Sequence, residues 1–252
     1  MISIKTKQEI ELMRKSGEIT YGVLSSLKDY IKPGMTTKQI DKYVYDYIVS
    51  HDATPSFLDY EGYPASSCVS INDMVVHGIP DDTIIKNGDI VSVDVGSIYK
   101  GYHSDAARTH AVGEIRPDLQ KLIDVTRESF FEGIKFAKEG NHLYDISRAI
   151  GDYAESFGYG VVRELCGHGI GTGLHESPEI PNFQMRRRGP KLKAGMTLAI
   201  EPMINLGTER IRWMSDNWTV VTADGKASAH YENTILITKD EPKILSIADG
   251  NV

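Results

Sequence analysis

Two segments of the chain share a pattern in which an acidic residue ends an apolar run. The segments are Lys86-Asn-Gly-Asp-Ile-Val-Ser-Val-Asp94 and Lys193-Ala-Gly-Met-Thr-Leu-Ala-Ile-Glu201. Lys32-Pro-Gly34 and Lys138-Glu-Gly140 form a second echo at nearly the same spacing, each followed by a predicted helix. Two echoes in the same order predict one domain, residues 1–252, built from two related halves, about 1–113 and 114–252. A pseudo-twofold arrangement of these halves would bring Asp94 and Glu201 to a shared centre.

The apolar pattern separates helical segments from strand segments. Helical spacing predicts helices at about 6–31, Thr37–Ser50, Pro117–Lys138 and Leu143–Phe157. Short β-branched runs predict strands at Cys68–Ile71, Ile90–Val95, Met196–Ile204, Trp218–Thr222 and Thr234–Thr238. Asp224-Gly225 is a dipeptide typical of a hairpin turn. This order predicts the α+β class, with a mostly antiparallel sheet and flanking helices.

Composition and charge narrow the class of protein. A net charge of -7 and a pI near 5.6 argue against a nucleic-acid-binding surface, and we interpret the basic run Arg186-Arg187-Arg188 as a solvated loop. The first residues lack the apolar core of a secretion signal, and no run approaches the roughly 18 apolar residues of a membrane span. Cys68 and Cys166 form no CxxC pair, so we expect reduced thiols. These features predict a cytoplasmic protein with no membrane partner and no specific nucleic-acid partner.

Acidic residues occupy strand positions where an apolar side chain is expected. Asp94 and Glu201 both follow apolar runs, and a buried carboxylate is costly unless a cation or several donors compensate it. A turn at Tyr99-Lys100-Gly101 would place Asp94 opposite Asp105 to within about a residue, and like charges across a strand pair are destabilising. A divalent cation between them reverses that interaction. Glu232 is a further acid in a strand-like run.

Nitrogen ligands are available in the glycine-rich segment Cys-Gly-His168-Gly-Ile-Gly-Thr-Gly-Leu-His175. Its glycines let the backbone approach other groups closely, which suits a loop or irregular strand that aims histidines inward. The segment is neither a dinucleotide-binding fingerprint nor an HExxH zinc site, because the third glycine is out of register and Glu179 stands at the second histidine position. Carboxylates with one imidazole suit Mn, Fe, Co or Zn at a hydrolytic centre.

Each of these residues also has a purely structural interpretation. Asp94 or Glu201 alone could be a buried acid held by backbone donors, His168 alone could be a hydrogen-bonded core histidine, and His77 alone could serve a turn. Aromatic residues near them could be ordinary core. Taken together, four acids at unfavourable positions linked by an internal repeat predict a metal site.

Several motifs together resemble the type I methionine aminopeptidases, which have the pita-bread metallopeptidase fold. The motifs are Val-Asp94-Val-Gly, His103-Ser-Asp105, Cys166-Gly-His168-Gly-Ile-Gly, His175-Glu-Ser-Pro, Ile-Glu201-Pro-Met203 and Tyr231-Glu232-Asn-Thr. The match extends from about Thr6 to Thr238, and the ligand types occur in the family's order. The resemblance therefore covers nearly the whole chain.

The resemblance implies roles for individual residues. It makes Asp94, Asp105, His168, Glu201 and Glu232 the ligands of two divalent metal ions, with Asp105 and Glu232 bridging. It makes His77 and His175 the histidines that contact substrate, and it places Phe57, Tyr60, Tyr63, Cys68, Met203 and Trp218 around the substrate methionine. Phe57, Leu174 and Gly96 depart from the residues of well-known bacterial members, where Cys, Phe and Thr stand.

These roles lead to a hypothesis for function. The chain would remove the N-terminal methionine from nascent proteins and peptides, through attack of a metal-bridging water or hydroxide on the first peptide bond. Glu201 would manage the proton of this water, His175 would stabilise the carbonyl oxygen, and His77 would contact the scissile nitrogen. The α-amine of the substrate would bind the metal held mainly by Asp94. The two metals are Co, Mn, Fe or Zn.

Two alternatives remain open from the sequence. A peptidase of the same fold that cuts before proline would share the ligands, but such enzymes usually carry an extra N-terminal domain, and the first helix here is predicted from about residue 6. A non-catalytic binding module would keep the fold without metals, yet it would have no reason to retain acids in strands. The expected partners are nascent polypeptide N-termini, with the ribosome surface as a candidate contact, and we expect a monomer.

Overall fold

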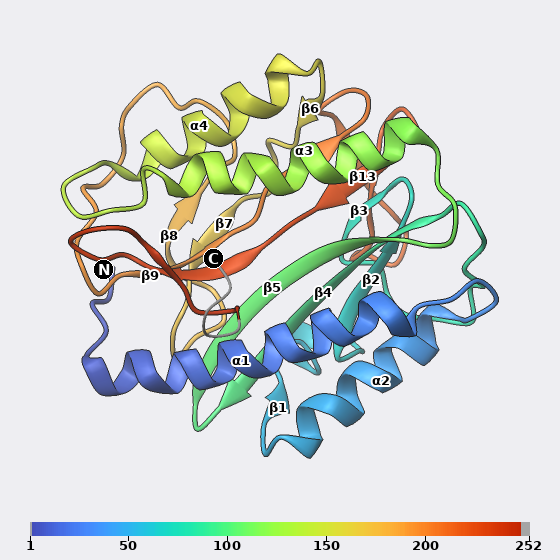
Figure 1. Ribbon diagram of the computed structural model, residues 1–252, viewed down its shortest axis with the longest axis horizontal. Helices are drawn as coiled ribbons and strands as arrows, with labels where there is room; N and C mark the ends of the chain where they lie inside the picture. The colour runs from blue at the N-terminus through green and yellow to red at the C-terminus, as the bar shows by residue number, and fades with distance from the viewer. Residues whose placement is uncertain (1, 248–252) are drawn as a thin grey trace.

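A computed structural model describes residues 2–247 of the chain (Figure 1). The helices are α1 (Lys7–Tyr30), α2 (Thr37–Ser50), α3 (Pro117–Ile134) and α4 (Leu143–Ser156), with a short 3-10 helix η1 (Tyr60–Gly62). The strands are β1 (Thr54–Pro55), β2 (Ser67–Ile71), β3 (Met74–Val76), β4 (Ile90–Tyr99), β5 (Tyr102–Ala111), β6 (Gly160–Val161), β7 (Gly167–Gly169), β8 (Glu176–Ile180), β9 (Thr197–Ile200), β10 (Met203–Asn205), β11 (Ile211–Trp213), β12 (Val220–Thr222), β13 (Ser228–His230), β14 (Asn233–Leu236) and β15 (Lys243–Ile244). This mixture of helices and strands confirms the predicted α+β class.

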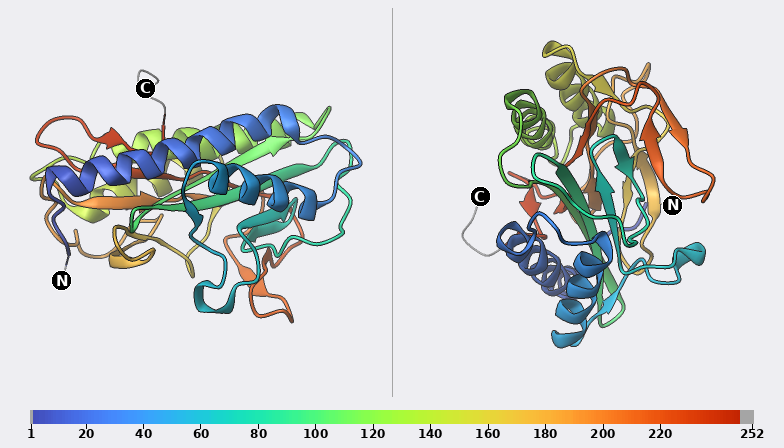
Figure 2. Two further views of the ribbon diagram at one scale, coloured as in Figure 1. Left: turned by 90° about the horizontal axis from the view of Figure 1, so that it is seen from below. Right: turned by 90° about the vertical axis from the view of Figure 1, so that its right-hand side faces the viewer.

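The strands of the described residues form four antiparallel sheets. β1, β4 and β2 follow in order, with β5 on β4, and a larger sheet has the order β15-β14-β9-β7-β8. Smaller sheets have the orders β13-β10-β6 and β11-β12-β3. All of these pairs are antiparallel, as predicted. Helices α1 and α3 lie against one side of the curved sheets, and irregular loops lie on the other side (Figure 2).

Helix boundaries follow local signals in the sequence. Thr6 and Glu9 form the capping box at the start of α1. The Glu9 amide donates to the Thr6 hydroxyl, and the Thr6 amide donates to the Glu9 carboxylate. Helix α3 ends at Ile134, earlier than the predicted Lys138, because the chain tightens into turns in which Ala137 donates to the carbonyl of Ile134. The other predicted helix ends agree with the structure within a residue or two.

Two strand predictions were wrong in detail. The predicted strand Met196–Ile204 is two strands, because Pro202 has no N–H to donate and the chain changes sheets there: β9 pairs with β7 and β14, whereas β10 pairs with β6 and β13. The turn at Asp224-Gly225 exists, with Gly225 at a φ of 69°. It does not close a hairpin, because β12 before it pairs with β3 and β11, and β13 after it pairs with β10.

The predicted duplication has a counterpart in matched backbone hydrogen bonds. Gly34 donates to the carbonyl of Ile85 at 2.8 Å, and Gly140 donates to that of Leu192 at 3.1 Å. At the start of β4 and just before β9, the amides of Gly88 and Gly195 donate to the carbonyls of Val112 and Ile237, both at 2.9 Å. All four glycines have φ between 92° and 95°, a conformation that other residues rarely adopt. The repeated Lys-x-Gly sequences therefore have a shared structural cause.

The two related segments meet where β5 passes the start of β14. Ala107 and Glu232 exchange both backbone hydrogen bonds, at 3.3 Å and 3.0 Å. On one side of this exchange, the Thr234 hydroxyl accepts from the amide of Asp105 and donates to its carbonyl. On the other side, the Thr109 hydroxyl accepts from the amide of His230 and donates to its carbonyl. All four distances are 2.9 Å. The exchange thus lies on a local pseudo-twofold axis.

Helix α1 is fixed to the β4–β5 hairpin by a buried cluster of hydroxyl groups. Ser16 and Thr20 on α1 bond the hydroxyls of Ser97 and Ser104 at 2.9 Å and 2.5 Å, and Ser16 also donates to the Ser97 carbonyl at 2.8 Å. All four residues are fully buried. Because the cluster lies in the hairpin that carries Asp94 and Asp105, it sets the position of those strands relative to the helix.

No helix within the described part of the chain has the length and apolar character needed to cross a lipid bilayer.

The hydroxyl cluster predicts the effect of a Thr20→Val substitution. The isosteric change leaves the buried Ser104 hydroxyl without its 2.5 Å partner, so the free energy of unfolding should fall by about 1–3 kcal/mol. Urea unfolding followed by circular dichroism measures this loss. Thr126→Val is the matched control, because the buried Thr126 hydroxyl donates only to the Leu122 carbonyl within its own helix. Equal losses in the two variants would contradict a special role for the cluster.

Candidate active site

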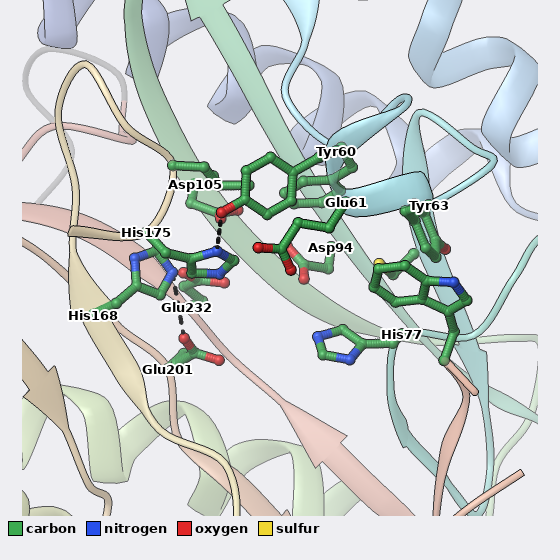
Figure 3. Close-up of a pocket in the computed structure, with 14 residues that line it drawn as sticks. Tyr60, Glu61, Tyr63, His77, Asp94, Asp105, His168, His175, Glu201 and Glu232 are labelled. Atoms are coloured by element: carbon green, nitrogen blue, oxygen red, sulfur yellow. Dashed lines mark hydrogen bonds and ion pairs between the residues drawn. The ribbon is translucent and has the colours of Figure 1, made fainter.

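Four carboxylates from separate elements point into one space (Figure 3). Asp94 lies on β4 and Asp105 on β5, while Glu201 directly follows β9 and Glu232 directly precedes β14. Ligand atoms of Asp105, His168 and Glu232 lie within 4.8 Å of one another, as do those of Asp94, His230 and Glu232. Glu201 completes the group, since its Oε1 is 3.7 Å from His168 Nε2. The structure therefore brings together all five residues predicted as metal ligands.

The relation between Asp94 and Asp105 differs from the sequence prediction. Asp94 pairs with Ala107, and Asp105 pairs with Gly96, so the two acids are diagonal neighbours and the predicted pairing within about a residue was wrong. The cause is the tight turn, in which Lys100 and Gly101 have φ of 49° and 84° and Tyr99 pairs directly with Tyr102. A two-residue offset keeps both side chains on the same face, where diagonal neighbours still interact.

The residues that the structure describes compensate the carboxylates only in part. Asp94 Oδ1, Asp105 Oδ1 and Glu232 Oε1 are buried and have no hydrogen-bond partner among the described residues. Arg108 lies close by, but its guanidinium donates to backbone carbonyls and to Asn233, not to a carboxylate. Buried acids without donors must bind protons or cations. The donor set of hard oxygens and imidazole nitrogen fits divalent metal ions.

Burial raises the pKa of every acid in the group, and neighbouring carboxylates raise the pKa of three of them further. Burial raises the pKa of Asp94 to about 7. Burial, and then the charges of Glu232 and Asp94, raise the pKa of Asp105 well above its usual value. Burial followed by neighbouring carboxylates does the same for the pKa values of Glu201 and Glu232. The site thus favours positive charge, whether as protons or as metal.

His168 is oriented and kept neutral by its surroundings. Its Nδ1 lies 2.9 Å from the Gly169 carbonyl, which places the proton on Nδ1 and leaves the Nε2 lone pair toward Glu201. Burial, and then His175, lower the pKa of His168 to about 3. Glycine is required beside it, because a Cβ on Gly167 would lie 2.4 Å from the Ala199 carbonyl oxygen. The glycine-rich segment therefore lets β7 lie close to β9.

The two other predicted histidines lie on the cavity wall. His175 Nδ1 is 2.9 Å from the Tyr60 hydroxyl, and its ring lies edge-on to that of His168 with centroids 4.3 Å apart. His77 has a φ of 59°, an unusual backbone conformation that turns its ring toward Trp218 with centroids 6.4 Å apart. Burial lowers the pKa of His77 to about 4, and burial also lowers the pKa of His175. Both imidazoles are therefore neutral near pH 7.

A cavity of about 170 Å³ opens above the carboxylates. Its walls include five of the six side chains predicted to surround the substrate methionine: Phe57, Tyr60, Tyr63, Cys68 and Trp218. Cys68 reaches it because it pairs with Asp94 in the sheet, and Tyr63 packs edge-on to Trp218 with centroids 5.1 Å apart. A metal-binding floor and an aromatic wall thus share one cavity.

Met203 is a correction to the sequence prediction. It does not line the cavity, and its fully buried side chain packs with Val75, Val76, Val162 and Val220. The reason is the break at Pro202, after which Met203 begins β10 and pairs with His230. Its side chain consequently joins a different apolar cluster.

The sequence analysis missed Glu61 and His230 at the site, and it named Leu174 only as a departure from bacterial members. Glu61 and Leu174 line the cavity, and His230 is buried with its Nε2 3.8 Å from both Glu201 Oε2 and Glu232 Oε2. His230 precedes Glu232 by two positions, and this spacing puts two side chains on one side of an extended chain. That spacing was the available signal for His230. Glu61 gave no signal, because its φ of 50° depends on the tertiary fold of η1.

Gly96 and Phe57 form a complementary pair beside the acids. Gly96 lies on the same face of β4 as Asp94, and a Cβ there would lie 2.8 Å from Phe57 Cε1 and 2.7 Å from Ser56 Cβ. The Ser56 amide also donates to the Gly96 carbonyl at 2.9 Å. The missing side chain at position 96 is therefore what admits the phenyl ring to the cavity wall.

Comparisons with known proteins agree with this geometry. Residues 11–239 match the model of metallopeptidase family M24. The chain is 52% identical over 247 residues to the methionine aminopeptidase of Clostridium perfringens, covering 98% of this chain and 99% of that protein. It superimposes with a TM-score of 0.96 on the crystal structure of methionine aminopeptidase from Thermotoga maritima, at 44% identity with 98% and 100% of the two chains covered. Prolidase from Pyrococcus furiosus gives a TM-score of 0.80 at 25% identity, with 98% of this chain and 66% of that chain covered.

The close contact at position 96 predicts coupling between Gly96 and Phe57. Gly96→Ala should destabilise the protein by about 1–3 kcal/mol, because the added methyl group overlaps the Phe57 ring. Adding Phe57→Ala should relieve part of the overlap, so a double-mutant cycle of unfolding free energies should give a coupling of at least about 0.5 kcal/mol. Strictly additive effects would show that the ring does not depend on Gly96.

The raised pKa of Asp94 predicts how a substitution changes stability with pH in metal-free protein. A carboxyl whose pKa is about 7 when folded stabilises the fold fully below 3.8, and this contribution is lost as the pH rises through about 7. Asp94→Asn should therefore match wild type near pH 4 and be more stable at pH 8, on the order of 1–3 kcal/mol. Urea unfolding in the presence of a chelator measures both values.

Asp145→Asn is the control of opposite sign. The hydrogen bond from Arg188 lowers the pKa of Asp145, so its contribution is present above 3.8 and is lost at lower pH. This variant should be less stable than wild type at pH 8. If Asp94→Asn also lost stability at pH 8, the carboxyl of Asp94 would not be an uncompensated charge.

Proposed function

The chain belongs to metallopeptidase family M24, and from this membership we propose that it is a metal-dependent aminopeptidase that removes the N-terminal methionine from nascent proteins and peptides. The observation that carries the proposal is the convergence of four carboxylates and His168 on the floor of an aromatic-lined cavity. Membership in a metallopeptidase family implies divalent metal ions, and the unpartnered oxygens at this floor are groups that such ions would bind.

Asp94, Asp105, His168, Glu201 and Glu232 would hold two metal ions. Glu232 belongs to both three-residue clusters, which supports a bridging position for its carboxylate. Asp105 lies beside Asp94 on the same sheet face and next to Glu232, which supports the second bridge. Co, Mn, Fe and Zn all accept this mixture of oxygen and nitrogen donors. Bound divalent ions polarise a carbonyl and lower the pKa of water toward neutrality, which supplies a nucleophile for peptide hydrolysis.

Glu201 is proposed as the residue that takes and returns a proton. It lies between two imidazoles, with Oε1 3.7 Å from His168 Nε2 and Oε2 3.8 Å from His230 Nε2. Burial, and then the charges of Asp94 and Asp105, raise the pKa of its carboxylate well above the usual value, which makes it a better proton acceptor than an ordinary carboxylate. Its position at the end of β9 fixes the carboxylate relative to the cavity floor.

His175 is proposed to stabilise the carbonyl oxygen of the substrate. When the Tyr60 hydroxyl donates to His175 Nδ1, the imidazole proton is held on Nε2. A neutral ring in this tautomer can donate a hydrogen bond to an oxygen that gains negative charge. His77, half-buried and neutral on the opposite wall, is proposed to contact the scissile nitrogen.

The aromatic wall would select methionine. Phe57, Tyr60, Tyr63 and Trp218 offer ring faces and edges that a thioether contacts favourably, and Cys68 and Leu174 add smaller apolar surfaces. At the floor, the partly exposed Asp94 supplies negative charge near the site for the α-amine, which would restrict action to chain ends. Nascent chains in the cytoplasm are the proposed substrates, handled by a monomer of two related halves, with the ribosome surface as a candidate contact.

The test is release of free methionine from Met-Ala-Ser by metal-stripped protein, with and without added Mn²⁺ or Co²⁺. Activity should return with metal and fall at least about a hundredfold in Asp105→Ala, because one bridging carboxylate is lost. Asp46→Ala is the matched control, since Asp46 is an exposed aspartate on α2 paired with Lys42.

Other outcomes would point to other functions. Faster cleavage of an Xaa-Pro peptide than of Met-Ala-Ser would favour the peptidases that cut before proline. A folded protein that takes up no metal and releases no methionine would favour a binding module with this fold.

A further inference from the structure

We propose that His230 is an additional imidazole ligand of the metal centre, and that it binds the ion held by Asp94 and Glu232. The inference rests on the proposed metal-dependent function and adds a residue to its site. His230 is the last residue of β13, only 2% of its surface is exposed, and its Nε2 has no hydrogen-bond partner among the described residues. A buried nitrogen of this kind requires a partner.

The surroundings of His230 Nε2 are those of a metal ligand. Glu201 Oε2 and Glu232 Oε2 each lie 3.8 Å away, too far for a hydrogen bond. Metal–nitrogen and metal–oxygen bonds are about 2.0–2.2 Å long, so two donors on one ion lie roughly 3–4 Å apart. Ligand atoms of Asp94, His230 and Glu232 all fall within 4.8 Å of one another. The spacing is therefore that of groups that share an ion.

The local pseudo-twofold axis gives an independent reason. Ala107 and Glu232 exchange backbone hydrogen bonds. Asp105 and His230 lie two positions before them, and a threonine hydroxyl from the facing segment holds the backbone of each. The Thr234 hydroxyl bonds the amide and carbonyl of Asp105, and the Thr109 hydroxyl bonds those of His230, at 2.9 Å throughout. His230 is thus the counterpart of Asp105.

The two ligand clusters have the same composition. One consists of Asp105, His168 and Glu232, and the other consists of Asp94, His230 and Glu232. Each cluster holds one aspartate, one histidine and the shared glutamate. The backbone around His230 is as firmly fixed as that around Asp105, so its imidazole is held over the second metal position as a preorganised donor.

An imidazole at this position changes which metals the site favours. Nitrogen donors favour Co²⁺ and Zn²⁺ over Mn²⁺ more strongly than carboxylates or amides do. His230→Gln keeps a polar side chain of similar size but removes the imidazole. Calorimetric titration should show one of two binding steps for Co²⁺ weakened about tenfold to a hundredfold, with a smaller loss for Mn²⁺.

Cadmium NMR tests ligation directly and does not depend on activity. Wild-type protein carrying nitrogen-15 histidine and loaded with Cd²⁺ should give two cadmium signals, each coupled to one imidazole nitrogen. His230→Gln should remove one coupling and His168→Gln the other. His110→Gln is the control, because His110 Nε2 is also buried without a partner but belongs to neither cluster. It should leave both couplings unchanged.

The outcomes separate the two proposals. Coupling to a single histidine in wild-type protein, lost in His168→Gln and kept in His230→Gln, would overturn the role of His230 while leaving the metal centre. Failure of folded wild-type protein to bind any of these metals would overturn both. The wild-type spectrum by itself counts the histidines that bind cadmium, and the two variants identify them. A single coupling in wild-type protein therefore already contradicts two histidine ligands, even if a variant folds poorly.

Discussion

The burial of four carboxylates in one small space is the constraint on which the rest of the structure depends. Asp94, Asp105, Glu201 and Glu232 repel one another, and three of them carry buried oxygens with no partner among the described residues. Nothing local would hold such a group together. It persists because each acid is fixed at a strand or a strand end, and the strands are held by packing elsewhere. Cations at this point would convert the repulsion into attraction.

Pseudo-twofold symmetry explains why acids from distant parts of the chain meet. The Lys-x-Gly turns place β4 and β9 in matching positions, so Asp94 and Glu201 arrive as counterparts. The exchange between Ala107 and Glu232 then joins the halves at the axis. The symmetry is broken in the side chains, since Ala107 stands opposite Glu232 and Asp105 corresponds to His230. A symmetric backbone thus carries an asymmetric set of donors.

The rigid floor and the cavity wall have different origins. The floor consists of residues on β4, β5 and β7 and at the ends of β9 and β14, whereas the wall is built largely from the segment around η1 and from the loop before β12. Hydrogen bonding between Tyr60 and His175, and the fit of Phe57 against Gly96, connect wall to floor. Two further contacts join the wall to the floor, because Cys68 pairs with Asp94 and the His175 ring lies edge-on to that of His168.

The sequence by itself determined the helices and the antiparallel class, because capping residues and apolar period are local signals. Acids in apolar runs, together with the family resemblance, pointed to the five residues that converge at the site. It left the diagonal pairing of Asp94 and Asp105, the core position of Met203 and the partners of β12 and β13 to the tertiary structure. The side of the sheet on which a residue lies depends on turn geometry and on strands far away in the chain. His230 illustrates this, because its place beside Asp94 and Glu232 depends on the contact between the two halves.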